Sequence, residues 1–219
     1  MEKRKTKPWP GFFVAIEGPD GVGKSTLVNE LCKRFEAAQF ALPSFTYLGP
    51  VLRASFSGEH QLQAWERLAM FTADRIACFH TQIKPALDDG RCVITDRYVL
   101  SNLIYQTVDL ANEYEDAWLG PKNADLEWLR QSCWRSPSPD FTVILDLDPE
   151  VARERMAERG ELDGYDANIE RQRQVRRRFQ CSYPRGRHSF VSVDCGPEEL
   201  AERAARLLRM QMRDVGFTP

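Results

Sequence analysis

Residues Gly18–Ser25 have the types and spacing that bind a chain of phosphates. They read Gly-Pro-Asp-Gly-Val-Gly-Lys-Ser and fit the pattern G-x-x-x-x-G-K-[ST]. Glycines let the backbone curl its N–H groups around an anion, and a following helix adds partial positive charge at its start. Lys24 is expected to reach the β- and γ-phosphates, and the Ser25 hydroxyl to bind Mg²⁺.

The flanking residues favour a phosphate loop over the alternative, a glycine-rich turn with a chance lysine. Phe12–Glu17 has the apolar pattern of a buried strand, and a helical pattern follows from Lys24. The loop predicts binding of ATP or GTP, and the sequence has no guanine-reading N-K-x-D motif. A short chain with a second polar site favours a kinase for a small acceptor. The residues expected to hold ATP are Gly18, Asp20, Gly21, Gly23, Lys24, Ser25 and Thr26.

The second polar site is predicted where another strand ends. Arg91–Thr95 reads as a strand, and Asp96 and Arg97 follow it. Because ligands bind at the carboxyl ends of parallel strands, Arg97 is expected to grip phosphate oxygens, and Asp96 to hold hydrated Mg²⁺ or the phosphate loop. The alternative is a structural Asp–Arg pair that caps the next helix.

Two helical pairs add groups suited to a flat base. Ser101 and Tyr105 lie four residues apart and share a face, and the amide of Gln106 suits a pyrimidine edge. Phe71 and Arg75 are also four residues apart, so the ring could stack on a base while the arginine donates to a carbonyl. By spacing alone, a core aromatic beside a solvated arginine is the more ordinary interpretation.

Short apolar runs alternate with helical patterns, and these elements must position the polar groups. The expected strands are Phe12–Glu17, Ser44–Leu48, Arg91–Thr95, Phe141–Leu147 and His188–Val193. Helical spacing runs from Leu27 to Ala38, from Leu68 to Leu87 and from Leu200 to Gln211, and Asp148-Pro149-Glu150 has the residues of a helix start. The alternation predicts an α/β fold of P-loop NTPase type, a doubly wound parallel sheet of about five strands flanked by helices.

Composition narrows the class of protein. The 219 residues carry a net charge of −2 and 42% hydrophobic residues, and we expect one domain at residues 12–219 after a loose tail at residues 1–11. Balanced charge argues against nucleic acid as a partner, and no apolar run reaches the length of about 18 residues that spans a membrane. The six cysteines form no C-x-x-C pair, which favours reduced thiols and a cytoplasmic location.

Together the motifs resemble the thymidylate kinase family, P-loop enzymes that convert dTMP to dTDP with ATP. The matching stretches are Phe13–Thr26, Ile83–Leu87 with Gly90, Asp96–Tyr98, Ser101 with Tyr105-Gln106, Pro139-Asp140 through Leu145-Asp146 to Pro149, and Arg159–Asp163. They extend from about Phe12 to Phe179, and together they are far more specific than the phosphate loop alone.

The resemblance implies roles for the site residues. Asp20 would contact the sugar 3′-hydroxyl of the acceptor, Arg97 would hold its phosphate, and Tyr105 would crowd the sugar 2′ position. Phe71 would stack on thymine, and the base would face Arg75, Ser101 and Gln106. A lid at about residues 159–168 would close over ATP, and the enzyme would be a homodimer.

One departure from the family pattern concerns positive charge at the transferring phosphate. Branches of the family carry an arginine where Gly21 or Gly164 stands, and this sequence has neither. An arginine at that place can be worth about 10³–10⁵ in rate. Our hypothesis is that Arg155 or Arg159 supplies the charge when the lid closes.

Further departures lie on the acceptor side. After strand two the family usually carries a signature that grips the acceptor phosphate, whereas this chain has Tyr47–Arg53, in which Arg53 could fill the role. A glycine-rich turn that is common after Gln106 in bacterial relatives is absent as well. Because these departures lie on the acceptor side, they bear on which base the site prefers more than on the reaction that it catalyses.

The sequence therefore predicts ATP-dependent phosphoryl transfer to a deoxynucleoside monophosphate, with dTMP as the acceptor and Mg²⁺ as the cofactor. One alternative acceptor is another or base-modified deoxypyrimidine monophosphate, or a nucleoside. The missing arginines also leave open a non-catalytic nucleotide-binding protein, although intact Lys24, Asp96 and Arg97 argue against it.

Overall fold

The computed structural model describes residues 8–56, 59, 61–113, 123–158, 160, 168–182, 184 and 186–218. Within these residues the protein has one five-stranded sheet in the order β2-β3-β1-β4-β5, and every neighbouring pair of strands is parallel. The strands are β1 Phe12–Glu17, β2 Ala38–Ala41, β3 Cys92–Asp96, β4 Phe141–Asp146 and β5 Arg187–Ser192. The predicted α/β fold with about five parallel strands is confirmed.

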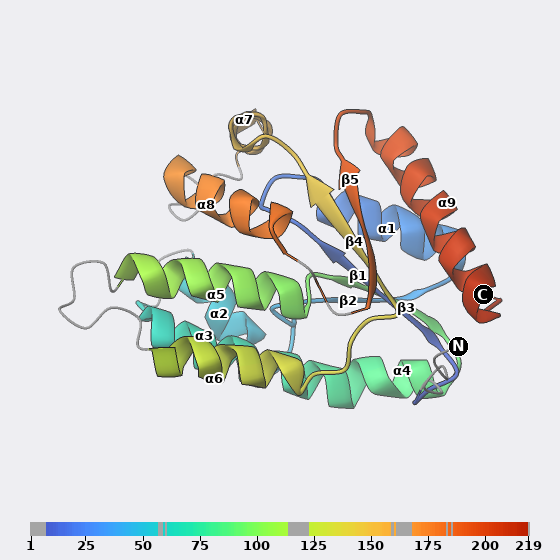
Figure 1. Ribbon diagram of the computed structural model, residues 1–219, viewed down its shortest axis with the longest axis horizontal. Helices are drawn as coiled ribbons and strands as arrows, with labels where there is room; N and C mark the ends of the chain where they lie inside the picture. Colours follow the sequence, from blue (N-terminus) through green and yellow to red (C-terminus); the bar gives the residue numbers. More distant parts are fainter. Residues whose placement is uncertain are drawn as a thin grey trace.

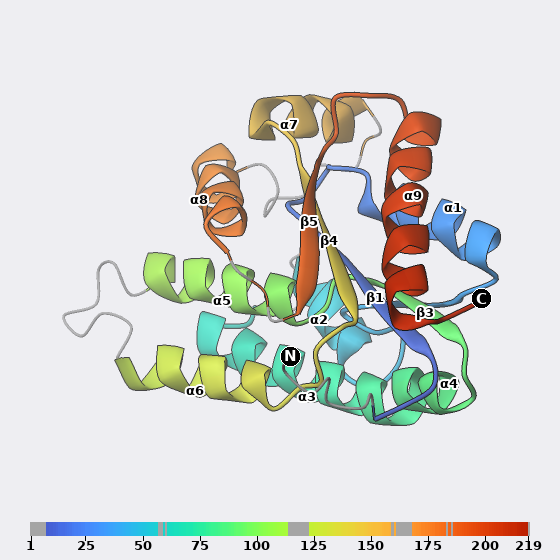
Figure 2. The ribbon, with the colours of Figure 1, turned by 45° about the vertical axis from the view of Figure 1, so that its right-hand side comes forward.

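Helices cover both faces of this sheet (Figures 1 and 2). They are α1 Lys24–Phe35, α2 Gly49–Phe56, α3 Ala64–Cys78, the π-helical turn η1 Phe79–Ile83, α4 Lys84–Asp88, α5 Val99–Glu113, α6 Asn123–Trp134, α7 Pro149–Glu158, α8 Ile169–Gln180 and α9 Pro197–Val215. α1 and α9 lie on one face, and α3 to α6 lie on the other. In the described part of the chain, no helix combines the length and apolarity needed to cross a bilayer.

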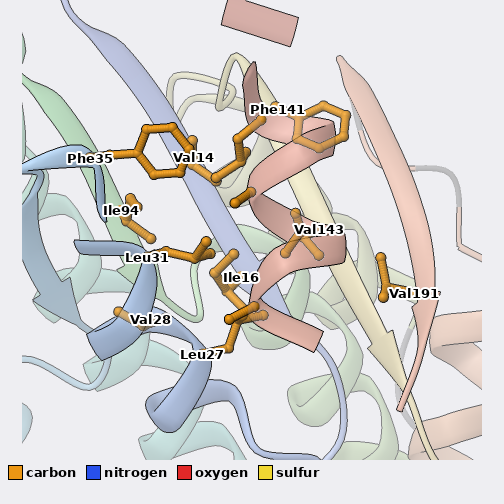
Figure 3. Close-up of a cluster of buried hydrophobic side chains, with 14 of the residues drawn as sticks. Val14, Ile16, Leu27, Val28, Leu31, Phe35, Ile94, Phe141, Val143 and Val191 are labelled. Carbon is orange, nitrogen blue, oxygen red and sulfur yellow. The ribbon is translucent and has the colours of Figure 1, made fainter. Parts of the chain in front are cut away.

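The core explains why the strands read as continuous apolar runs. Every residue of β1 is buried, because alternate side chains enter separate clusters on the two faces. Val14 and Ile16 pack with side chains of α1 and α9, as Figure 3 shows, whereas Phe13 and Ala15 pack on the side of α3 and α4. The sheet is thus packed against helices on both faces.

The second strand corrects the sequence prediction. Ala38–Ala41 pairs with β3, and the predicted strand at Ser44–Leu48 does not form. The Leu42 N–H still donates to the Asp96 carbonyl at 3.0 Å, but Pro43 has no N–H to continue the ladder. The aromatic residues that suggested a strand, Phe45 and Tyr47, are exposed. Ala38 was expected to end a helix and instead begins β2.

The remaining element predictions hold closely. The other four expected strands form within a residue of their expected bounds, and α7 begins at Pro149 as the Asp-Pro-Glu start predicts. The expectation of a loose tail is wrong for Trp9, which is buried and packs against Phe79 at 5.9 Å between ring centroids. Residues 1–7 lie outside the described residues.

Candidate active site

The phosphate loop connects β1 to α1 at the carboxyl edge of the sheet. Gly18, Gly21 and Gly23 all have positive φ angles, and α1 begins at Lys24. A Cβ on Gly21 would lie 2.9 Å from the Ala152 carbonyl oxygen of α7. This close approach gives a physical reason for glycine here, because a larger side chain such as arginine would displace α7.

Lys24 is buried in the loop, and its ammonium group donates to the Pro19 carbonyl. Burial and the nearby Arg97 lower the pKa of Lys24 to about 8. The acidic side chains of Asp20, Asp96 and Glu17 act in the opposite direction and raise it. A phosphate chain would restore the cation, because it brings negative charge to a desolvated ammonium group. The lysine is therefore poised to bind an anion.

Asp20 is the centre of a polar cluster at the tip of the loop. Its carboxylate accepts hydrogen bonds from Arg97, from the Tyr105 hydroxyl at 2.7 Å and from Gln172 Nε2 at 3.3 Å. Burial would raise the pKa of Asp20, but Arg97, Lys24 and Tyr105 together hold it well below its usual range. Asp20 is thus a fixed carboxylate shared by the loop, α5 and α8.

The expected metal ligands also come together. The Ser25 hydroxyl on α1 donates to Asp96 Oδ2 at the end of β3, with 2.5 Å between the oxygens. Mg²⁺ prefers such oxygen donors and usually completes its shell with waters and substrate phosphates. The donor set and its position beside Lys24 therefore fit the magnesium ion predicted from the sequence.

Arg97 is held in a strained backbone conformation, with φ at +67°. Such angles are uncommon outside glycine and persist where the surroundings enforce them. Its N–H donates to the Ile16 carbonyl at 2.9 Å, and its guanidinium group reaches Gly18 O and Ser101 Oγ, each at 3.2 Å. The backbone of Arg97 is thus bonded to β1, and its guanidinium group is bonded to the phosphate loop.

Glu17 has a structural role that the sequence analysis missed. Its buried carboxylate accepts hydrogen bonds from the backbone N–H groups of Tyr98, Leu100 and Ser101 at the start of α5. The Ser101 hydroxyl donates to it as well, so Ser101 is hydrogen-bonded to both Glu17 and Arg97. Burial raises the pKa of Glu17, with the Ser101 hydrogen bonds opposing this. The acid at the end of β1 thereby fixes α5 against the loop.

A cavity of about 140 Å³ lies between α3 and α5, and the residues expected to bind the acceptor line it, with the exception of Arg53. Phe71 and Arg75 line it from α3, and Tyr105 and Gln106 from α5. Arg75 is itself buried, and it donates to Ser136 Oγ after α6 at 3.1 Å and to two further acceptors within α6, Ser132 O and Cys133 Sγ. The interpretation of Arg75 as a solvated arginine is therefore wrong.

Asn102 lines the same cavity and was not among the predicted residues. It is 6% exposed, and in the described part of the chain neither polar atom of its side chain has a hydrogen-bond partner. The side-chain oxygen of Gln106, four residues later, is buried and unpartnered within the same range. Buried polar atoms of this kind indicate a bound ligand with its own donors and acceptors. The four-residue spacing to Gln106, which places both amides on one helix face, is the sequence signal that could have identified Asn102.

A second cavity of about 470 Å³, here called the phosphate cavity, lies beside the phosphate loop. Lys24, Ser25 and Asp96 line it. Arg53 of α2 also lines this cavity and donates to the Pro43 carbonyl, while burial lowers its pKa. The two cavities share five residues, namely Asp20, Leu42, Pro43, Phe56 and Arg97. A phosphate chain in one cavity and a flat ring in the other would therefore meet at Asp20 and Arg97.

One candidate lid arginine, Arg155, is not among the residues that line either cavity. Arg155 lies on α7, but among the described residues of that helix Met156 is the one that lines the phosphate cavity. Arg159 and most of the expected lid, residues 161–167, lie outside the described residues. Which arginine supplies charge to the transferring group stays a prediction.

Comparison with known proteins shows which family the sequence matches. The thymidylate kinase family model matches residues 16–202. A probable thymidylate kinase of Methanosarcina acetivorans is 34% identical over 204 residues, which cover 89% of this chain and 93% of the relative. A thymidylate kinase of Rhodopirellula baltica is 30% identical over 210 residues, covering 91% and 81%.

A solved structure shows the same fold. The chain resembles the structure of thymidylate kinase from Candida albicans with a TM-score of 0.74 and 22% identity, over 91% of this chain and 92% of that chain. At this identity the likeness concerns the fold alone. The family match covers most of the sequence, including the phosphate loop and the residues that line the smaller cavity, and the chain belongs to the thymidylate kinase family of phosphotransferases.

Proposed function

We propose that the protein transfers the γ-phosphoryl group of ATP to dTMP, which gives ADP and dTDP. The observation that carries this proposal is the junction of the two cavities at Asp20 and Arg97. A donor phosphate chain on the loop and an acceptor phosphate beside Arg97 would lie within reach of each other there. Family membership supports the same reaction.

The donor side would use the loop backbone and two side chains of α1. Lys24 would bind the β- and γ-phosphates and offset their charge. Ser25 and Asp96 would hold Mg²⁺, which supplies Lewis-acid charge neutralisation to the phosphate oxygens when bound. These three side chains lie together in the structure.

The acceptor side would place a thymine ring in the smaller cavity. Phe71 would stack on the ring, while Arg75, Asn102 and Gln106 supply donors and acceptors for its edge. The unpartnered amide of Asn102 and the unpartnered side-chain oxygen of Gln106 support this placement, because a pyrimidine edge would satisfy them. Ser101 would act mainly through Arg97 and Glu17.

The sugar and phosphate of the acceptor would lie toward the phosphate loop. Asp20 would accept a hydrogen bond from the 3′-hydroxyl, and Tyr105 beside it would leave no room for a 2′-hydroxyl. Arg97 would turn from Asp20 toward the acceptor phosphate, with Arg53 as a second cation from α2.

The chemical step needs positioning more than acid–base catalysis. An oxygen of the acceptor phosphate attacks the γ-phosphorus, and the bond from that phosphorus to the β–γ bridging oxygen breaks, which releases ADP. Lys24 and Arg97 neutralise charge on the transferring group, and burial strengthens their effect. Arg155 or Arg159 would add charge on closure of the lid. If alanine at neither position lowers kcat about tenfold, the charge comes from elsewhere.

We also propose a cytoplasmic homodimer. The six cysteines suit a reducing compartment. Exposed aromatic residues on α3 and α6 support an interface: Trp65 and Trp128 are 38% and 41% exposed, and their ring centroids lie 5.4 Å apart. A second copy of this chain is the expected occupant of that surface.

ADP release from Mg·ATP with a panel of acceptors tests the proposed reaction. The panel holds dTMP, dUMP, dCMP, purine monophosphates and thymidine, with Lys24→Ala as the matched inactive control. We expect ADP release with dTMP and none from the Lys24 variant. Turnover with another acceptor instead of dTMP would identify that compound as the substrate. ATP binding without any acceptor-dependent ADP release would support a non-catalytic protein.

A further inference from the structure

A buried ion pair lies in the wall of the acceptor cavity. Arg171 Nε of α8 donates to Asp109 Oδ1 of α5 at 2.8 Å, and these side chains are 8% and 5% exposed. Both residues line the cavity. A buried ion pair is weak evidence for stability, because the cost of desolvating two charges offsets their attraction. Its place in the cavity wall therefore calls for a functional explanation.

The pair lies against Tyr105. Asp109 follows Tyr105 by one helical turn on α5, so the two residues share a face. The Arg171 guanidinium carbon lies 5.3 Å from the centroid of the Tyr105 ring, within the range of a cation–π contact. Phe179 contacts the same ring edge-on from the other end of α8, at 6.3 Å between centroids. The ring is thus enclosed by its own helix and by α8, which pack together (Figure 2).

The first turn of α8 also reaches the phosphate loop. Gln172 follows Arg171 in sequence and donates a hydrogen bond to the Asp20 carboxylate. The same carboxylate accepts the hydrogen bond from the Tyr105 hydroxyl. Arg97 contacts Asp20 and the Tyr105 ring as well, but it is the side chain expected to turn toward the acceptor phosphate. Once it turns, Tyr105 and Gln172 are left to hold Asp20. Arg171 differs from Arg97 because its guanidinium group is paired with Asp109.

We propose that Arg171, anchored by Asp109, is a positioning residue that fixes Tyr105 and, through Tyr105 and Gln172, the Asp20 carboxylate at the sugar end of the acceptor site. This inference rests on the proposed function. The proposal makes affinity for the acceptor depend on the Arg171–Asp109 ion pair between α8 and α5, although neither residue is expected to bind a phosphate group. A misplaced binding group can cost far more than the contact it makes.

Steady-state kinetics of three variants test the assignment. Arg171→Gln removes the cation, and Arg171→Gln with Asp109→Asn leaves two amides that can bond to each other with no buried charge unpaired. Arg173→Gln is the matched control, because Arg173 is exposed two residues along α8 and pairs with Glu150 and Glu170. The readouts are KM for dTMP, KM for ATP, kcat and the melting temperature.

The Arg171 variant and the double variant are expected to raise KM for dTMP about tenfold and to leave KM for ATP within about twofold. The double variant should regain the melting temperature but not the affinity, and the Arg173 control should match the wild type in KM for both substrates. A folded double variant with wild-type KM for dTMP would overturn the proposal, because the pair would then be structural.

Other outcomes would also overturn it. Equal increases in KM for ATP and dTMP would indicate general distortion, and failure of both variants to fold would assign the pair to the fold itself. If the wild type releases no ADP with any acceptor, the proposed function fails and the positioning role with it. If the wild type is active and the variants keep its KM for dTMP, the positioning role alone fails.

Discussion

The Tyr105 hydroxyl donates a 2.7 Å hydrogen bond to the Asp20 carboxylate, which joins the wall of the acceptor cavity to the tip of the phosphate loop. The two residues are 85 positions apart in the sequence, on α5 and between β1 and α1. A ligand that moves either side chain must act on the other. The contact is therefore a direct link between the two proposed substrate sites.

Replacing Tyr105 with phenylalanine tests this link. The variant keeps the ring, and with it the steric barrier at the sugar, but Asp20 loses one hydrogen bond. Since a hydrogen bond to a charged group contributes about 1.5–3 kcal/mol, we expect kcat/KM for dTMP to fall at least about tenfold. The measurement is repeated with Asp20→Asn and with the double variant. Effects that simply add in the double variant would show that the two side chains act independently.

Glu17 gives a prediction about stability and pH. Burial raises its pKa above the value of 4.5 for an exposed glutamate, so the folded protein binds the proton more tightly than the unfolded chain. Stability contributed in this way is complete at pH values below 4.5 and is lost as the pH rises through the folded pKa. The difference in melting temperature between wild type and Glu17→Gln should therefore fall as the pH rises. Subtracting one melting curve from the other cancels the remaining titrating groups, and a constant difference would contradict the prediction.

The fold could be predicted because its signals are local. The phosphate loop, the continuous apolar pattern of β1 and the Asp-Pro-Glu start of α7 each depend on neighbouring residues. β2 was misplaced because the aromatic run after Pro43 has strand-like composition, whereas its aromatic side chains face solvent. What ended the strand was the missing N–H of Pro43, a backbone effect that outweighed composition.

Only part of the candidate site could be predicted, because its hydrogen bonds depend on packing between elements that are distant in the sequence. Asp20, Arg97 and Tyr105 could be named from motifs, but their shared hydrogen bonds depend on how α5 packs against the loop. Glu17 reads as the last residue of an apolar strand, and only the start of α5 gives it a partner. Arg171 stands in a run of arginines on α8, and only the packing of α8 on α5 distinguishes it from its exposed neighbours.

The exposed tryptophans predict the oligomeric state. Trp65 and Trp128 lie in contact on α3 and α6, and aromatic residues of this kind form the centres of protein interfaces. We expect a homodimer in sedimentation, and Trp65→Glu with Trp128→Glu should weaken it roughly thirtyfold or more. Val151→Glu on α7 is the matched control, because Val151 is 38% exposed on a different surface. A variant that dimerises like the wild type would place the interface elsewhere.

Asn102 should show opposite effects on stability and activity. Its amide is buried without a partner among the described residues, and such a group costs about 1–3 kcal/mol. Asn102→Leu is therefore expected to keep or raise the melting temperature while lowering kcat/KM for dTMP at least about tenfold. Asn112→Leu, an exposed position on the same helix, controls for the added apolar surface. A lower melting temperature with an unchanged kcat/KM for dTMP would make Asn102 a structural residue.

Lys24 predicts how ATP affinity depends on pH. Burial and Arg97 lower its pKa to about 8 in the free protein, and only the protonated amine offsets the charge of the phosphates. Bound ATP favours the cation and raises that pKa, so the complex retains a proton that the free protein releases as the pH rises. The Kd for ATP should therefore be nearly constant below about pH 7.5 and should rise as the pH approaches 9, toward tenfold for each pH unit.

Calorimetric titration of ATP, with Lys24→Ala as the reference, measures this dependence. The alanine variant binds more weakly, and it carries every titrating group of ATP and of the protein except the lysine. The ratio of the two affinities therefore isolates Lys24, and it should shrink between pH 7.5 and 9 as the wild type loses its advantage. A ratio that stays constant across this range would mean that Lys24 keeps its proton, and that the carboxylates of Asp20, Asp96 and Glu17 outweigh burial in the free loop.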